Sequence, residues 1–427
     1  MIADAQVPHS INWIKVLTKA GHKVSLISTY PTAGEGLDLE HLEVVTLDPS
    51  ARLRATEKAV ALGTKTVENK PLISKLRGSG LWASMAKLRD RTVPWRIASK
   101  SRIVTDLIQE WEPDVVHAMR VTFEGVLAQQ AVSRAPRPLV LSTWGNDFSF
   151  FAAASPTATK LVQDAVSSCD GLHSDCHKDV TNAHRLGLRR DVPVTVAPGN
   201  GGINRDIFYP GEATAETRAK FDIPNEARVI LNPRGMKAGI RNDIFFAAMP
   251  AVLAEFPDTV FVCLGAAGNR TAIDLAQKYG VTGSTRLVGT VQHHEMPEIF
   301  RLADTFVSPS EHDGTPNSML EAMACGAFPV LTPLEGVCEW IEDEKNGLFF
   351  DVEDVAGMGN QMIRSLRDTE LRARVLESNQ TVIEERASQS GSLRLLEQLY
   401  KEAIGHWQQN APTRSAARNE NHSEGLA

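Results

Sequence analysis

Residues 308–326 read SPSEHDGTPNSMLEAMACG and carry the clearest architectural signal in the chain. This stretch leaves an apolar run, passes through a loop of turn-forming residues, and enters a helical pattern that stops at Gly326. Pro316 suits the first turn of this helix, and Thr315 or Asp313 is placed to cap it. A strand, a short loop and a helix in this order predict one unit of a parallel α/β sheet.

The rest of the chain repeats this pattern. Short apolar runs alternate with longer amphipathic segments, which favours parallel sheets covered by helices on both faces. The predicted strands are 1–5, 22–28, 42–47, 114–118, 138–144, 170–174, 192–198, 227–232, 259–265, 285–289, 304–309, 328–332 and 347–350. A segment dense in Gly and Pro, 197–213, separates the seventh strand from the eighth and is interpreted as a linker.

The pattern therefore predicts an α/β chain of two Rossmann-like, doubly wound domains in series. The first covers 1–206 and the second 207–387, followed by a C-terminal helix at 388–409 that returns to the first domain. The polar segment 410–427 is expected to be a disordered tail. Because ligands bind at the carboxyl ends of parallel strands, a central cleft between the facing domains is the expected active site.

Composition excludes several classes of protein. The chain has 427 residues, is 42% hydrophobic and carries a formal charge of −7, which argues against a general nucleic-acid binder. Its 5 cysteines show no CxxC spacing, so reduced thiols are expected rather than disulfides or a zinc site. No signal peptide or membrane-spanning apolar run is apparent, and we expect a cytoplasmic protein.

The start of the helix after the 308–316 loop is suited to a phosphorylated ligand. The amides of Asn317, Ser318 and Met319 would lie at the positive end of the helix dipole, where phosphate oxygens bind. Glu321 would repel a bare phosphate and suits hydroxyl groups instead, such as a ribose diol. Asp313 could hold the hydroxyls of a second sugar, so the pattern fits a nucleotide-sugar. A capping box with solvated acids explains the same residues about equally well.

The motif Asp313-x7-Glu321, followed by AMACGAFPV and later by EWIEDEKNGLFF, resembles glycosyltransferase family 4 (group 1). These are retaining nucleotide-sugar glycosyltransferases with the GT-B fold, and the resemblance extends from residue 1 to about 405. It implies that Glu321 binds the donor ribose and Asp313 the transferred sugar. It also implies that the loop at Gly314 and Thr315 and the three helix amides bind the diphosphate. The family has Glu at the first acidic position, so Asp313 shortens the reach by one methylene.

Two cations beside the diphosphate are also implied by the resemblance. Arg234 matches the first, but the usual spacing places the second at Gly239, so Lys237 and Arg241 compete for that role. Cations suit this position because the departing nucleoside diphosphate gains negative charge as the glycosidic bond breaks. They also remove the need for a metal, and with no convincing DxD motif we expect neither a metal nor another cofactor.

The first domain is expected to bind the acceptor. His9, Trp144 and Asn146 lie at or just beyond predicted strand ends, where they would line the acceptor side. Asp147 is a catalytic candidate that could orient an acceptor hydroxyl, and a helix cap is the alternative. His9 could equally do no more than precede a helix.

His117 is a further catalytic candidate, predicted at the carboxyl end of its strand and facing the cleft. Many relatives have a second His two residues later, and this chain has Met119 there. A buried structural histidine is therefore about as good an interpretation of His117.

A basic strip at residues 65–102 contains ten Lys and Arg residues against two acidic ones, with Trp82 and Trp95 interleaved. Such a strip suits an anionic membrane surface or a lipid-phosphate acceptor. A solvent-exposed helical insertion explains the basic residues about as well.

Together these features predict a retaining transferase that moves a sugar from a nucleotide-sugar to a glycan or lipid-linked acceptor, in polysaccharide or glycoconjugate biosynthesis. A sugar-nucleotide epimerase of the same fold and a non-catalytic carbohydrate-binding relative are the alternatives. Release of nucleotide that depends on an added acceptor would separate the transferase from both.

Overall fold

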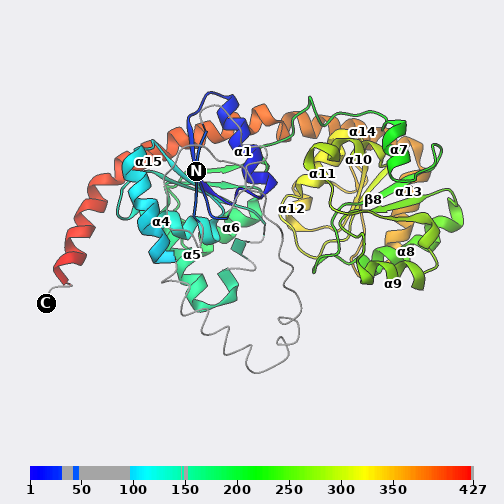
Figure 1. Ribbon diagram of the computed structural model, residues 1–427, viewed down its shortest axis with the longest axis horizontal. Coiled ribbons are helices and arrows are strands. Elements are labelled where there is room, and N and C mark those ends of the chain that lie inside the picture. The colour runs from blue at the N-terminus through cyan, green and yellow to red at the C-terminus, as the bar shows by residue number, and fades with distance from the viewer. Residues whose placement is uncertain (31–41, 48–96, 146, 149–151, 425–427) are drawn as a thin grey trace, which may run out of the picture. The chain divides into compact units, whose positions relative to one another are not determined.

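The computed structural model describes the backbone of residues 1–30, 42–47, 97–145, 147–148 and 152–424 (Figure 1). Side chains are described over the same ranges except at 154 and 411–424. The chain forms two compact units. The first comprises Met1–Ser174, Asp179–Val196 and Leu393–Ala427, and the second comprises Asp175–Lys178 and Ala197–Ser392. The division after Val196 precedes the boundary at residue 206 that the sequence suggested.

The first unit contains a seven-stranded sheet in the order β3-β2-β1-β4-β5-β6-β7, in which every pairing is parallel. Its strands are β1 (Ile2–Ala3), β2 (Val24–Ser28), β3 (Leu42–Thr46), β4 (Val116–Met119), β5 (Leu139–Thr143), β6 (Gly171–Ser174) and β7 (Val194–Val196). In β1, Ile2 is paired with Ile27 on one side and with Ala118 on the other, so the strand order turns at β1 and β4.

The second unit contains a six-stranded parallel sheet in the order β10-β9-β8-β11-β12-β13. Its strands are β8 (Val229–Asn232), β9 (Val260–Cys263), β10 (Thr285–Leu287), β11 (Thr305–Ser308), β12 (Phe328–Leu331) and β13 (Leu348–Phe349). All of these strands lie inside predicted segments, and the predicted α/β class with two doubly wound sheets is confirmed.

Helices connect the strands in both units (Figure 1). Up to β7 they are α1 (Pro8–Lys19), a helix over 97–111, η1 (Val121–Gly125), α4 (Val126–Val132), η3 (Ala152–Ala154), α5 (Pro156–Ser168) and α6 (His177–Arg185). The later ones are α7 (Ala215–Lys220), α8 (Asn242–Glu255), α9 (Arg270–Lys278), η4 (Thr282–Ser284), η5 (His293–Glu295), α10 (Met296–Leu302), α11 (Asn317–Cys325), α12 (Glu335–Cys338), α13 (Val355–Arg367), α14 (Thr369–Val382), η6 (Ile383–Ala387) and α15 (Gln389–Glu424).

The second sheet is buried on both faces, as its uninterrupted apolar strands predict. On β8, Val229 and Leu231 pack into one cluster with residues of α10 and α11. Ile230 points the other way, into a cluster formed with α8, α9 and α13. Because successive side chains of a strand alternate between faces, one short strand contributes to two cores.

The long helix α15 completes the core of the first unit. Leu396, Leu399 and Ala403 are fully buried and share a cluster with Trp13 and Ile14 of α1. This face of the first sheet therefore obtains its apolar cover from the two ends of the chain.

The prediction that residues 410–427 are disordered is wrong for the described backbone, because α15 continues to Glu424. Several residues of the helical part, including Ala411, Ala416 and Ala417, have favourable helix propensity, and extending an existing helix avoids the cost of nucleation. Most of the predicted membrane-binding strip, residues 65–96, lies outside the described residues. Among the helices that are described, none has the length and apolar character needed to cross a bilayer.

Candidate functional site

The candidate site is built where the strand order of the second sheet turns. Strand β8 pairs with β9 on one side and with β11 on the other, and the loops that leave β8 and β11 are bonded together. The N–H of Arg241 donates to the carbonyl of Pro309 (2.8 Å), and the N–H of Glu311 donates to that of Gly239 (2.8 Å). Ligands of open α/β sheets bind at such switch points. The two loops and the start of α11 are therefore the place to look for a ligand.

Arg234 and Asp313 form an ion pair across these loops. The Arg234 guanidinium also donates to Ser318 Oγ (3.3 Å), and its backbone N–H donates to Asn232 Oδ1 (3.0 Å). The two charged side chains retain 22% and 15% of their exposure, so a ligand can still reach them. Burial raises the pKa of the Asp313 carboxyl, and Arg234 opposes that rise. The structure thus brings together three residues that the sequence assigned to the donor.

The start of α11 lacks the predicted side-chain cap. Its N-cap position is Pro316, which offers no side-chain hydrogen bond. Asp313 is instead paired with Arg234, and the Thr315 hydroxyl is bonded elsewhere, so the prediction that either one caps this helix is wrong. The predicted helix stop is confirmed, because Gly326 takes a left-handed conformation (φ 90°).

One of the three predicted amide donors is already bonded. The N–H of Met319 donates to the carbonyl of Pro316 (2.9 Å), and its side chain is fully buried. Asn317 and Ser318 are half-buried. The first turn of α11 therefore keeps its dipole without a capping side chain, and Asn317 and Ser318 are the amides best placed for an anion.

The loop before α11 is fastened to the segment 175–178. The Thr315 hydroxyl donates to the carbonyl of Asp175 and accepts from the indole N–H of Trp340 (2.8 Å). Glu339 accepts the backbone N–H of His177 (2.8 Å). Thr315 is thus a buried anchor of the loop, with only 3% of its surface exposed, rather than an open ligand contact.

The backbone of Gly314 packs against a second glycine, Gly336. A Cβ on Gly336, at the start of α12, would lie 2.5 Å from the Gly314 carbonyl oxygen. Only a residue without a side chain allows the two backbone segments to approach this closely.

Glu321 lies in the second turn of α11 and is 6% exposed. Its Oε1 accepts from Asn200 Nδ2 (3.3 Å) and lies 3.2 Å from His293 Nε2. The sequence missed both partners. The segment 197–213, interpreted as a linker, is part of the site, and its PGNGG motif was the available signal. His293 follows β10 in a polar loop that contains no motif by which the sequence could have predicted a site residue.

The structure distinguishes the two candidates for a second cation. Arg241 is bonded to Asp243 (2.9 Å) and Glu353 (2.5 Å) and lies 3.8 Å from Glu311. Lys237 is exposed and has no ion-pair partner among the described residues. Its charge, like that of Lys178, lowers the pKa of Asp313. Arg241 is therefore neutralised by carboxylates, whereas Lys237 and Lys178 contribute positive charge near Asp313.

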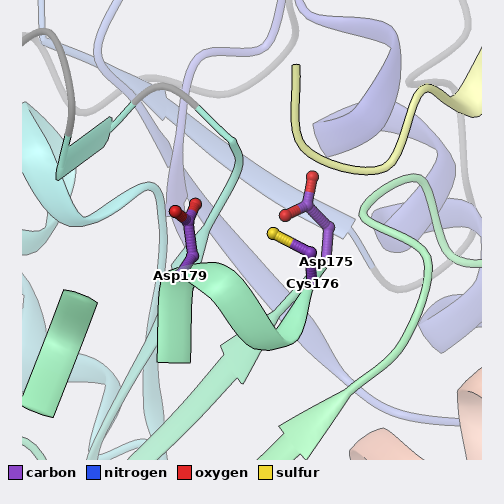
Figure 2. Close-up of side chains that lie close together, drawn as sticks. All are labelled: Asp175, Cys176 and Asp179. Carbon is purple, nitrogen blue, oxygen red and sulfur yellow. The ribbon is translucent and has the colours of Figure 1, made fainter. Parts of the chain in front are cut away.

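Asp175, Cys176 and Asp179 lie close together at the start of α6 (Figure 2). All three are buried, and their candidate ligand atoms lie within 4.8 Å of one another. Carboxylate and thiolate groups at this spacing are known metal ligands. Each of these residues also has partners inside the protein, so their proximity alone does not identify a metal site.

In the first unit, the predicted acceptor-side residues form a compact group. The His9 and Trp144 rings meet edge to face, with centroids 5.3 Å apart. Asp147 accepts from the backbone N–H of Trp144 (3.2 Å) and is 3% exposed. Burial raises the pKa of the Asp147 carboxyl to about 7, against the opposing charge of Arg120. Asn146 lies outside the described residues.

His117 is not at the end of its strand, as predicted, but is the second residue of β4 and 1% exposed. Its Nδ1 lies 2.7 Å from Tyr400 Oη, and its Nε2 lies 2.8 Å from Ser142 Oγ. Burial, helped by the neighbouring His173, holds the pKa of His117 well below its usual value. These contacts correspond to the buried structural histidine, the alternative interpretation of this residue.

Arg120 and Glu124 are charged residues of the first unit that the sequence analysis did not single out. Arg120 Nε lies 3.9 Å from both Glu124 Oε2 and Asp147 Oδ1, and the Arg120 backbone has φ 133°. Glu124 is 1% exposed and accepts from Thr29 Oγ1 (2.8 Å). Strained backbone and buried charge are common in functional regions, but Arg120 and Glu124 belong to no sequence motif that would have predicted a role.

Comparison with known proteins finds a family match within the second unit. Residues 214–382 match the family described as glycosyl transferases group 1. A D-inositol 3-phosphate glycosyltransferase of Salinispora arenicola is 32% identical over 209 residues, which is 45% of this chain and 47% of that protein. The chain spans about half the length of the curated relatives it matches.

Solved structures match nearly the whole chain. A sucrose-phosphate synthase from Thermosynechococcus elongatus has a TM-score of 0.68 and 16% identity, covering 93% of this chain and 92% of its own. HepE of Anabaena, solved in complex with UDP-glucose, has a TM-score of 0.67 and 16% identity, covering 94% of this chain and 99% of its own. These likenesses show the fold, which is GT-B as the resemblance implied.

Proposed function

Because residues 214–382 match the family model of glycosyl transferases group 1, we propose that this protein transfers a glycosyl group from a nucleoside-diphosphate sugar to a hydroxyl group of a glycan or lipid-linked acceptor, with retention of configuration. The observation that carries the proposal is the cluster at the β8–β11 switch point. Arg234 contacts both Asp313 and Ser318 beside the uncapped start of α11, with Glu321 one turn further on.

The charges of this cluster suit the parts of a nucleotide-sugar. Arg234 and Lys237 are the proposed partners of the diphosphate, together with the amides of Asn317 and Ser318. An incoming diphosphate competes with Asp313 for the Arg234 guanidinium and leaves the carboxylate to bind hydroxyl groups of the transferred sugar. Arg241, surrounded by carboxylates, is not part of this proposal.

We propose that transfer needs no metal ion. Arg234 and Lys237, with Lys178 nearby, offer the positive charge that stabilises a departing diphosphate. In the first unit, His9 and Trp144 are the proposed acceptor contacts, and the buried Asp147 is proposed to orient the acceptor hydroxyl through Trp144, whose backbone N–H it accepts.

The proposal is tested first by donor binding. UDP-glucose, GDP-mannose and ADP-glucose are screened for thermal stabilisation, since a ligand that binds the native state raises its melting temperature. We expect one base to be preferred, and Glu321→Ala to abolish its binding in calorimetry. Unchanged affinity in Glu321→Ala would show that the ribose is placed wrongly.

Turnover is tested next, with inositol phosphates, glycolipids and oligosaccharides as acceptors. Nucleotide release that requires an acceptor supports a transferase. Release without any acceptor favours the epimerase alternative, and binding with no release under either condition favours a non-catalytic relative.

We further propose that the basic strip at 65–102 associates with anionic lipid, an idea that rests on the sequence alone. Co-sedimentation with vesicles should then require phosphatidylglycerol. Equal binding to neutral vesicles would contradict it.

A further inference from the structure

Glu321 is held in one orientation by two groups that are distant in sequence. Asn200 Nδ2 lies 3.3 Å from its Oε1, and His293 Nε2 lies 3.2 Å from the same oxygen. A carboxylate only accepts hydrogen bonds, so the His293 nitrogen that faces it carries the proton. Among the described residues, no group donates to Oε2. One oxygen of Glu321 is therefore satisfied by the protein and the other is left for a ligand.

The Asn200 amide cannot turn away from Glu321 without losing a bond. The backbone N–H of Gly202 donates to Asn200 Oδ1 (3.2 Å), which leaves Nδ2 to face the carboxylate. Gly202 is itself fixed, since a Cβ there would lie 2.5 Å from Ser392 Oγ. The donor on this side of Glu321 is thus held by the backbone of the 197–213 segment.

His293 is fixed from the other side. It begins η5, where Gln292 and Glu295 form a reciprocal capping box that defines the short helix. Its ring lies 5.8 Å from the ring of Phe208, and its side chain is 39% exposed, against 8% for that of Glu321. His293 therefore connects a nearly buried carboxylate to the protein surface.

We propose that His293, with Asn200, is a positioning residue that directs Glu321 Oε2 toward the ribose hydroxyls of the donor and thereby sets the preference for ribonucleotides over 2′-deoxyribonucleotides. The proposal rests on the proposed function, since it assumes that a nucleoside diphosphate binds beside α11. A carboxylate held at one oxygen presents the other as a fixed acceptor, and a ligand that lacks the matching hydroxyl leaves it unsatisfied.

The test measures the affinities of UDP, GDP and ADP and of their 2′-deoxy counterparts by calorimetry, for the full chain and its variants. In the wild type, the preferred ribonucleotide should bind at least several-fold more tightly than its deoxy form. His293→Leu removes the donor and should weaken ribonucleotide binding about tenfold while affecting the deoxy form far less. His293→Gln keeps an N–H donor and should recover most of the affinity.

Two controls separate positioning from damage to the fold. His294→Leu changes the exposed neighbour in η5 and should leave both affinities unchanged. In a Glu321→Leu background, whose residual binding is followed by thermal shift at high nucleotide concentration, His293→Leu should cause no further loss, because the carboxylate it positions is gone.

The outcomes distinguish the inference from the proposed function. If the wild type binds no nucleoside diphosphate, both fail together. If it binds but His293→Leu weakens the ribo and deoxy forms equally, or neither, the positioning role is overturned while the proposed function stands.

Discussion

The loops at the carboxyl edge of the second sheet and those at the carboxyl edge of the first differ in how exposed their charged side chains are. In the second unit, Arg234 and Asp313 are paired but keep 22% and 15% of their exposure. In the first unit, Asp147 and Glu124 are 3% and 1% exposed, beside an arginine held at 3.9 Å. Burial raises the pKa of the carboxylates in both units, but the partly exposed Arg234–Asp313 pair can exchange a protein partner for a ligand at a smaller desolvation cost. The same strand topology therefore supports a ligand-ready pair in one unit and a closed network in the other.

The largest expected effect comes from a substitution in the buried network of Arg120, Glu124 and Asp147. Asp147 has a folded pKa of about 7 against an ordinary 3.8, so folding favours its protonated form. The resulting contribution of Asp147 to the free energy of unfolding is fully present below the ordinary pKa of 3.8 and is lost as the pH rises toward 7. Relative to Asp147→Asn, the wild type should lose on the order of 4 kcal/mol between about pH 4 and pH 7, since each pKa unit corresponds to about 1.4 kcal/mol.

Denaturant unfolding of the wild type and Asp147→Asn at pH 4, 5.5 and 7 measures this loss. Asp106→Asn, an exposed carboxylate in the helix over 97–111, is the control and should follow the wild type. Parallel stability curves for the wild type and Asp147→Asn would show that Asp147 is not held protonated.

The next effect tests whether the open pair is available to a ligand. Arg234→Ala should weaken nucleoside-diphosphate binding about 10- to 100-fold, because hydrogen bonds between charged groups contribute about 1.5 to 3 kcal/mol. Arg241→Ala removes an arginine that three carboxylates already engage, and should change the affinity less than about threefold. Calorimetric titration compares the two variants. The reverse order of effects would move the diphosphate toward Arg241.

A smaller effect is expected from changing the packing beneath the loop that carries Asp313. Gly336→Ala places a Cβ 2.5 Å from the Gly314 carbonyl oxygen, so the loop that carries Asp313 must move. Overpacking of this kind costs about 1 to 3 kcal/mol, and we expect weaker nucleotide binding as well. Gly283→Ala is the matched control, since a Cβ there meets nothing within 4 Å. Thermal unfolding and nucleotide titration of both variants check this, and equal behaviour would mean that the approach of Gly336 to Gly314 is not tight in solution.

The smallest expected effect is none at all. If cations alone neutralise the leaving diphosphate, prolonged treatment with a chelator should leave the transfer rate unchanged. Loss of activity that Mn²⁺ or Zn²⁺ restores would contradict this, and Asp175→Asn would then test whether the cluster of Figure 2 holds the ion.

Much of the fold could be predicted because strands and helices leave local patterns. The alternation of apolar runs with helical segments predicted both parallel sheets, and the Asp313-x7-Glu321 spacing marked the loop and helix of the candidate site. The errors arose where a long-range partner decides the outcome. Thr315 does not cap α11 because its hydroxyl is bonded to Asp175 and Trp340, and His117 is buried because Tyr400 of α15 packs on it.

Local patterns were enough to predict the α/β class, the order of strands and helices, and the residues at the carboxyl ends of β8 and β11, because each of these depends on neighbours along the chain. Which charged side chains are already paired, by contrast, depends on tertiary contacts. Arg241 is occupied by carboxylates while Lys237 is not, and Glu321 meets partners 121 and 28 residues away in the chain. Contacts at such separations depend on how the loops fold over one another, and no local spacing encodes them.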